Sequence, residues 1–226
     1  FKEGIKKKLF IGVENEKFIF EKESNQRANY NKVSLVLEKL KNKFNWKEVK
    51  EGANLVGLKL GGKSISLEPG NQIELAGDKL ENIHKVCSES YSFQSQLEVV
   101  CKEIGLKTLS VGYDPFTDLK DVPNNPKKRY KLMTVEMPKN GELSINMMYQ
   151  TSGTQINLDY LSEDDFIKKF KLISYLTPLA IAIFANSPIK ENKPSGYLSY
   201  RARVWHETSR GGLPEIFLKN MDFEKY

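Results

Sequence analysis

The chain has 226 residues, of which 39% are hydrophobic and 28% charged, and its formal net charge is +6. Its size fits one large domain or two small ones, and its composition is typical of a soluble globular protein. Two cysteines exclude a disulfide framework, and lysines spread along the whole chain argue against a surface dedicated to nucleic acid.

The sequence gives no sign of a membrane or export signal. No signal-peptide pattern is present, and the longest apolar stretch, residues 172–185, is interrupted by Pro178 and by polar residues and is too short to span a bilayer. We therefore expect no membrane contact and a cytoplasmic location. Both a monomer and a homodimer fit the composition.

Hydrophobic periodicity predicts the first elements of the chain. Strands are expected over residues 10–20 and 54–60, with a helix over Asn31–Phe44 between them. The apolar stripe of this helix consists of Val33, Val36, Leu37, Leu40 and Phe44.

A strand-like pattern broken at Pro69-Gly70 follows over Ile65–Gly77. Side chains alternate along a strand, so one face of this segment is apolar and the other polar. The apolar face consists of Ile65, Leu67, Ile73 and Leu75, and the polar face of Ser66, Glu68, Gln72 and Glu74. Acidic groups crowded on one face repel each other unless water or a cation lies between them.

The middle of the chain is predicted to contain a long helix and a long loop. Asp78 is expected to cap a helix that ends at Gly105. A short strand over residues 106–111 comes next. The proline-rich stretch 113–141 has weak periodicity, which predicts an ordered loop with a functional role.

The last third of the chain returns to regular patterns. Strands are predicted over residues 143–148 and 154–158. Ser162 is expected to cap a helix with a buried apolar side and a kink at Pro178. A final strand is predicted over Tyr197–Trp205. Strands interleaved with long helices indicate an α+β fold.

Acidic and amide side chains recur on the predicted strands. Glu14 and Glu16 lie two residues apart, and Gln155, Asn157 and Asp159 alternate with apolar residues. Together with the polar face of 65–77, three strands can offer oxygen ligands to one side of one sheet. Mg²⁺ prefers oxygen and usually keeps waters and substrate phosphates as further ligands. The spacing predicts an acidic face able to bind a metal, and a merely solvated face is the alternative.

Six sequence blocks carry a family resemblance. They occur in the order GVENEKF, SISLEPGNQIELAG, PKKRYKLM, the run Met147–Asp159, FANSP and SGYLSYRARVW. Together they resemble the plant- and proteobacterial-type glutamate–cysteine ligase, over a region from about Ile11 to the C-terminus.

The resemblance implies a fold and a domain organisation. The expected fold is an antiparallel sheet curved around an active-site funnel with flanking helices, as in glutamine synthetase. The chain lacks an initial methionine, and sequences like GLPEIF (212–217) and DFEKY (222–226) fall near the middle of family members. We therefore expect residues 1–226 to form a single catalytic domain, the N-terminal portion of a longer ligase.

The resemblance also implies a reaction. The γ-carboxylate of L-glutamate is joined to the amino group of L-cysteine through an acyl phosphate, as the first step of glutathione synthesis. ATP is the co-substrate and Mg²⁺ the cofactor. Phosphoryl transfer to a carboxylate needs cations and positioning more than a nucleophile. The absence of a Ser/His/Asp or Cys/His constellation agrees with this chemistry.

Individual positions match family residues with known types of role. Glu14, Glu16 and Glu74 match metal-binding carboxylates, and Gln155 matches a polar ligand of metal or phosphate. Glu68 is left outside this set because the Pro69-Gly70 turn can direct it away.

Two arginines match positions near the glutamate substrate. Arg129 and Arg201 are expected to bind its carboxylates and to take part in catalysis, because a planar guanidinium holds a carboxylate through two hydrogen bonds. Met147 and Trp205 match residues that line the substrate pocket, although such residues are more often core. Cys87 matches a position that forms a redox-sensitive disulfide in some relatives, and simple packing on a helix is an equal alternative.

Some features depart from the family pattern. Many relatives read TCTVQVN where this chain reads TSGTQIN, so Gly153 removes a side chain from the pocket wall. Three alternatives stay open: a carboxylate–amine ligase with another amine acceptor, a non-catalytic nucleotide- or RNA-binding module, and a half-length chain that is inactive alone. A polar sheet face that is acidic disfavours RNA binding.

Overall fold

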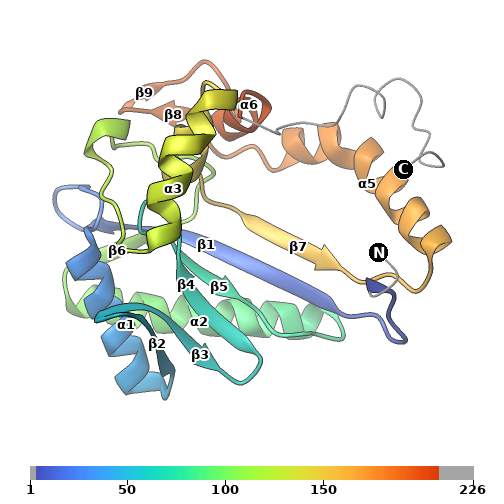
Figure 1. Cartoon of the computed structure of the whole chain (residues 1–226), viewed down its shortest axis with the longest axis horizontal. Helices are drawn as coiled ribbons and strands as arrows, with labels where there is room; N and C mark the ends of the chain where they lie inside the picture. Colours follow the sequence, from blue (N-terminus) through green and yellow to red (C-terminus); the bar gives the residue numbers. More distant parts are fainter. Residues whose placement is uncertain (1–3, 209–226) are drawn as a thin grey trace.

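The computed structural model describes residues 4–208 and shows an α+β fold with an antiparallel sheet and six α-helices in that range (Figure 1). The predicted α+β class with an antiparallel sheet is confirmed, whereas the curved funnel and the likeness to glutamine synthetase stay predictions. The blocks at 212–217 and 222–226 lie outside the described residues.

The strands are β1 (Ile11–Glu21), β2 (Lys47–Glu51), β3 (Asn54–Leu60), β4 (Lys63–Leu67), β5 (Ile73–Ala76), β6 (Leu106–Leu109), β7 (Thr154–Leu158), β8 (Ile189–Lys190) and β9 (Lys193–Pro194). The α-helices are α1 (Tyr30–Phe44), α2 (Ile83–Glu103), α3 (Lys128–Glu136), α4 (Ser144–Gln150), α5 (Glu163–Ile183) and α6 (Tyr200–His206). The short 3-10 helices are η2 (Leu119–Asp121) and η3 (Met137–Asn140).

The long strand β1 organises the main sheet. It pairs with β5 along one edge, and with β7 and then β6 along the other, always antiparallel. Strands β4, β3 and β2 follow outward from β5. The predicted break at Pro69-Gly70 is the turn between β4 and β5, where a Cβ on Gly70 would lie 2.5 Å from the carbonyl oxygen of Tyr149. Only glycine fits this close approach without a shift of the backbone.

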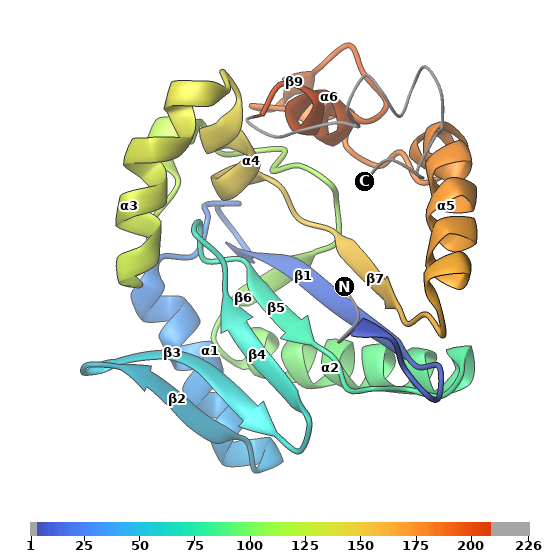
Figure 2. The same cartoon turned by 45° about the vertical axis from the view of Figure 1, so that its right-hand side comes forward.

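One face of the sheet is covered by α1 and α2 and forms the core. The predicted apolar stripe of α1 is buried there except for Phe44, which is partly buried. The apolar face of β4 and β5 and Leu97 and Val100 of α2 are buried in the same core. Figure 2 shows α3, α4, α6 and α5 around the margin of the opposite side. The sheet therefore leaves its polar face free for a site.

Two segments predicted as strands are helices. Residues 143–148 fall mostly in α4, and Tyr197–Trp205 falls mostly in α6. Ser199 caps α6 by accepting a hydrogen bond from the N–H of Ala202 (3.3 Å). Alternation of polar and apolar residues over a few positions fits both structures, and packing of the buried face decides between them.

Other local predictions also need correction. Asn82 rather than Asp78 caps α2, since its side-chain oxygen accepts from the N–H of Lys85 (3.0 Å). The helix is followed by Gly105 at φ +68°, the expected stop. The predicted loop 113–141 contains α3 and two 3-10 helices. Cys87 is exposed rather than packed on α2.

Helix α5 lies beside the sheet instead of packing into the core. Ser162 caps it as predicted, accepting from the N–H of Asp165 (3.1 Å). The apolar side predicted to be buried is exposed instead: Ile173 is 51% exposed and Leu179 is 55% exposed. None of the helices within residues 4–208 is long and apolar enough to cross a membrane.

A buried ion pair between Arg27 and Asp114 connects segments that are far apart in the sequence. The guanidinium of Arg27 donates to the Asp114 carboxylate (2.5 Å) and to the carbonyl oxygens of Gly70 (2.9 Å) and Tyr149 (3.4 Å). It also lies over the ring of Phe18, 4.2 Å from its centroid. Both charged side chains are almost fully buried. Arg27 therefore joins the turn after Glu68 to the end of α4.

Candidate active site

The register of three strands places the predicted metal ligands side by side. Glu16 pairs directly with Glu74 across β1 and β5, and Glu14 pairs with Gln155 across β1 and β7. Residues directly opposite each other in an antiparallel pair have side chains on the same face. The four side chains predicted from the sequence therefore share one face of the sheet, as expected.

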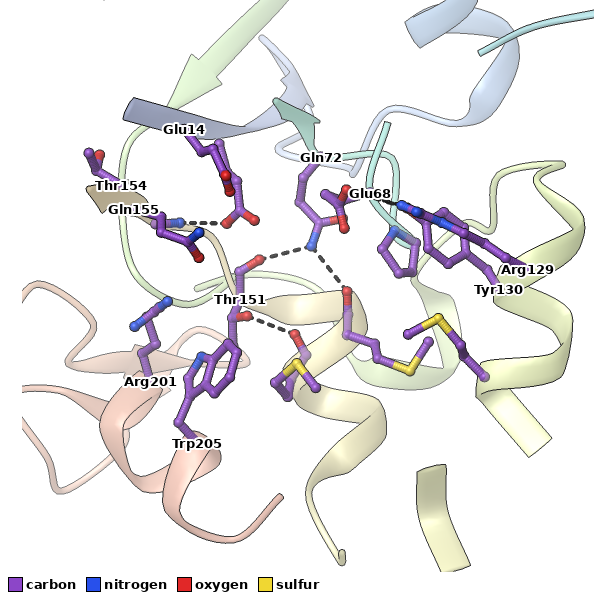
Figure 3. A pocket seen from close by; sticks show the side chains of 16 residues that line it. Glu14, Glu68, Gln72, Arg129, Tyr130, Thr151, Thr154, Gln155, Arg201 and Trp205 are labelled. Carbon is purple, nitrogen blue, oxygen red and sulfur yellow. Dashed lines mark hydrogen bonds and ion pairs between the residues drawn. The ribbon is translucent and has the colours of Figure 1, made fainter. Parts of the chain in front are cut away.

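A cavity of about 300 Å³ opens on this face (Figure 3). Three of the four predicted ligands line it, together with all four residues predicted for the substrate. Glu74 does not line it and lies beside Glu16, with its carboxylate accepting from the hydroxyl of Ser66 (3.3 Å). The lining residues are Glu14, Glu16, Glu68, Pro69, Gln72, Arg129, Tyr130, Met133, Met147, Met148, Thr151, Gly153, Thr154, Gln155, Arg201 and Trp205.

Burial, and then neighbouring carboxylates, raise the pKa of Glu16 and of Glu74. Burial raises the pKa of Glu16 to about 7, and the charges of Glu68 and Glu74 add to the shift. Burial likewise raises the pKa of Glu74 to about 7, with further contributions from Glu68 and Glu14. Such shifts mean that neighbouring positive groups do not balance the negative charge at neutral pH.

Glu68 belongs to the cluster, although the sequence left it aside. The turn at Pro69-Gly70 does not direct it away, since Glu68 lines the cavity. Its carboxylate accepts from the hydroxyl of Tyr130 (3.3 Å) and lies 3.7 Å from the guanidinium of Arg129. The alternation that placed Glu68 on the polar face with Glu74 was the available signal.

Removing one of these charges is expected to stabilise the fold in the absence of metal. A carboxyl whose pKa is raised on folding stabilises the protein fully below its ordinary pKa of 4.5, and this contribution is lost as the pH rises through about 7. With allowance for solvent screening, Glu74→Gln should add about 1 kcal/mol to the free energy of unfolding at pH 8, and little at pH 5. Thermal unfolding in chelator at both pH values measures this difference.

The exposed Glu23→Gln variant, which removes a carboxylate without a partner in the described residues, serves as the control and should change neither value. Mg²⁺ should stabilise the wild type more than Glu74→Gln at pH 8. A Glu74→Gln protein less stable than the wild type at pH 8 would show that a positive group already compensates this carboxylate.

The two predicted arginines lie on opposite sides of the cavity (Figure 3). Arg129, on α3, lies over the ring of Tyr130 (4.6 Å to the centroid) and remains largely exposed. Arg201, on α6, lies over the ring of Trp205 (5.3 Å). Burial lowers the pKa of Arg201, while the charge of Glu16 raises it. The Nε–H of Arg201 is buried without a partner in the described residues, so one donor is unused.

Helical geometry explains how α6 contributes to the cavity. Arg201 and Trp205 are four residues apart and so lie on one side of the helix. Tyr200 and Val204 are buried on another side, and Arg203 is exposed. Both residues therefore line the cavity, as the resemblance implied, although the predicted strand was wrong.

Helix α4 provides the other wall. Met147 lines the cavity as predicted, and Met148 lines it as well. Gln72 lies just before β5 and contacts this helix, since its side-chain amide donates to the carbonyl oxygens of Thr151 (2.8 Å) and Met148 (3.3 Å). These contacts fix the end of α4 against the sheet.

Gly153 lies between the acidic and basic sides of the site. Its N–H donates to the carboxylate of Glu16 (2.7 Å), and a Cβ at this position would lie 3.0 Å from Nη2 of Arg201. The absence of a side chain, noted as a departure from the family pattern, thus gives the Arg201 guanidinium its room.

Restoring a side chain here should displace Arg201. For the glutamate substrate that the resemblance implies, we expect Gly153→Ala and Gly153→Thr to raise the KM in that order, up to about tenfold for a loss near 1.4 kcal/mol. Steady-state kinetics with varied glutamate measure the effect. The thermal unfolding midpoint of both variants should equal that of the wild type, because the φ of Gly153 is not in the left-handed region. An unchanged KM in both variants would show that Arg201 does not bind the glutamate carboxylate.

The cavity has the donor chemistry of a magnesium site. Its oxygen ligands are those a hard cation prefers, and Mg²⁺ typically takes one or two carboxylates and completes its shell with waters and phosphates. Within residues 4–208, no group of three or more His, Cys, Asp or Glu side chains is arranged to hold an ion. Glu14 and Glu16 with Gln155, and Glu74 beside Glu16, are the residues that would hold the metal together with a bound phosphate.

Known proteins resemble this chain over nearly its whole length. Residues 10–226 match the family model of glutamate-cysteine ligase family 2 (GCS2). The chain is 44% identical over 98% of its length to the chloroplastic glutamate–cysteine ligase of Nicotiana tabacum and 43% identical over 98% to that of Medicago truncatula. It is 44% identical over 96% to chloroplastic ligase A of Oryza sativa subsp. japonica.

The matched region is less than half of each relative. The chain covers 43% of the Nicotiana protein and 44% of the Medicago and Oryza proteins. The family model, in contrast, matches nearly all of this chain, including the residues that line the cavity. The chain therefore belongs to glutamate-cysteine ligase family 2.

Proposed function

We propose that the protein containing this chain is an ATP- and Mg²⁺-dependent ligase that joins the γ-carboxylate of L-glutamate to the amino group of L-cysteine. The observation that carries the proposal is the register of β1, β5 and β7, which places Glu14, Glu16 and Glu74 on one face opposite Arg201. Membership in the family supports the choice of substrates.

The chemistry needs both signs of charge in one cavity. A glutamate γ-carboxylate oxygen attacks the terminal phosphorus of ATP, ADP leaves, and an acyl phosphate forms. The amine nitrogen then attacks the carbonyl carbon, the C–O bond to phosphate breaks, and the nitrogen loses a proton. A bound Mg²⁺ would neutralise charge on the transferred phosphoryl group. Arg201 and Arg129 would hold the carboxylates of the substrate, which fixes the distance between the reacting groups.

The glutamate subsite is expected at the Arg201 side of the cavity. Arg201 has an unused buried donor and lies against Trp205, whose ring excludes water from one side of the guanidinium. Charge-assisted hydrogen bonds are stronger where water is excluded. Arg129 is more exposed and lies beside Glu68, so a bound anion would compete with Glu68 for it.

A coupled assay on the natural polypeptide that contains this chain tests the proposal. It supplies glutamate, ATP and Mg²⁺ and compares cysteine with other amines. We expect cysteine-dependent release of ADP that falls about tenfold or more in Glu74→Gln, the size of loss seen when groups around a metal site are changed. Glu23→Gln should retain activity.

Each other outcome has a definite reading. Turnover with a different amine would keep the reaction type and change the acceptor. A folded protein with no amine-dependent turnover would contradict the proposal and leave the acidic face as a solvated surface.

A further inference from the structure

A second cavity, the lysine pocket, has a volume of about 460 Å³ and lies where β1 begins and β7 ends. Four of its lining residues are lysines, three of them consecutive. The lining consists of Lys6, Lys7, Lys8, Phe10, Gly12, Lys79, Asn157, Leu158 and Asp159.

The lysine pocket continues the line of side chains that forms the acidic site. Gly12 pairs with Asn157 across β1 and β7, immediately next to the pair of Glu14 and Gln155. Residues two apart on a strand lie on the same face, about 7 Å from each other. The amide of Asn157 donates to the Glu14 carboxylate (3.2 Å), so a single side chain joins the two places.

The positive charge of the lysine pocket is mostly uncompensated. Lys8 pairs with Glu81 (2.6 Å). Within residues 4–208, Lys6, Lys7 and Lys79 make no ion pair. The carboxylate of Asp159 accepts from the backbone N–H of Phe10 (3.1 Å) and so is partly satisfied by the backbone.

Gly12 lines the lysine pocket and leaves space in it because it has no side chain. A Cβ at this position would meet only the Cβ of Asn157, at 3.7 Å, which is an ordinary contact. The φ of Gly12 is not positive, so the backbone there accepts any L-residue. A side chain would therefore fit the strand and occupy the pocket.

We infer that the lysine pocket binds the phosphate chain of the nucleotide, with its terminal phosphate at the acidic cluster and the preceding phosphates over Gly12 and Asn157. The inference rests on the proposed function, which requires a nucleoside triphosphate whose terminal phosphate reaches Glu14 and Glu16. Lysines bind phosphate as mobile point charges, and three without acidic partners suit a polyanion. A neighbouring acidic cluster disfavours a long nucleic acid, which would have to cross it.

Direct binding measurements test the charge requirement. Isothermal titration calorimetry with MgATP and with magnesium tripolyphosphate compares the wild type with the double variant Lys7→Gln/Lys79→Gln. We expect binding of both probes to weaken about tenfold or more, because two charge-assisted contacts are lost. The matched control is Lys47→Gln/Lys59→Gln, a facing pair on β2 and β3 that removes the same charge elsewhere; it should bind like the wild type.

Two further measurements distinguish the effect of lysine charge from the effect of pocket shape. Gly12→Val should weaken MgATP binding without any change of charge, and ATP should protect Lys7 and Lys79 from acetylation, as read by mass spectrometry. Equal binding by the wild type and both pocket variants would overturn the lysine pocket as the phosphate site, as would absence of protection. Glutamate binding, measured separately in the same variants, should be unchanged, and its absence in the wild type would count against the proposed function instead.

Discussion

Replacing Arg201 with lysine is expected to lower kcat/KM for glutamate about 100-fold. Lysine keeps the charge but loses the planar pair of donors that holds a carboxylate at two points. It also loses the stacking on Trp205, from which the guanidinium is 5.3 Å away. Loss of one charge-assisted hydrogen bond costs about 1.5–3 kcal/mol, and about 2.8 kcal/mol corresponds to the expected 100-fold.

Arg203→Lys is the matched control for this experiment. Arg203 lies on the same helix, pairs with Glu207 (2.8 Å), and does not line the cavity. Its conversion to lysine should leave kcat/KM within about twofold of the wild type, as is usual for an exposed ion pair. Glutamate titration by calorimetry should show the same contrast between the two variants. Equal kinetics of Arg201→Lys and Arg203→Lys would remove Arg201 from the glutamate site.

Arg27→Met is expected to destabilise the fold by about 3–5 kcal/mol, because it leaves the carboxylate of Asp114 buried without its partner. It also removes the donor to the carbonyl oxygens of Gly70 and Tyr149. Urea unfolding followed by the fluorescence of the buried Trp46 measures the loss. The total stability of a domain is about 5–15 kcal/mol, so the effect is large.

The control for this variant is an exposed ion pair with the same N–O distance, 2.5 Å. Lys32→Met breaks the pair with Glu21, whose partners are both substantially exposed, and should cost less than about 1 kcal/mol. The double variant Arg27→Met/Asp114→Asn should recover part of the loss, since it no longer buries a lone charge. A small effect of Arg27→Met alone would mean that water reaches Asp114.

The sequence predicted the acidic face because a strand has a strict period of two. Glu14 and Glu16 lie on one strand and had to share a face, whatever that strand paired with. Glu68 precedes the turn that separates β4 from β5, so the period of two alone did not place it beside Glu74. The spacing did not contain the register that sets Glu16 opposite Glu74 and Glu14 opposite Gln155. Register depends on pairing between segments far apart in the chain, and here the family resemblance supplied the grouping.

The helices α4 and α6 show where local patterns were insufficient. Each has seven residues, too short for a helical period to be distinguished from alternation. Arg201 and Trp205 nevertheless share a side in both interpretations, since four is an even number and also one helical turn. In α5, a long apolar stripe predicted burial, but a stripe does not specify what covers it.

The buried pair of Arg27 and Asp114 restricts which substitutions the chain can accept during evolution. A substitution at either position alone produces an unpartnered charge inside the protein, while a joint substitution does not. The two positions, 87 residues apart in sequence, are therefore coupled as one unit of variation. In an alignment of related chains, we expect them to covary, with an apolar or amide residue at one position accompanied by an uncharged residue at the other.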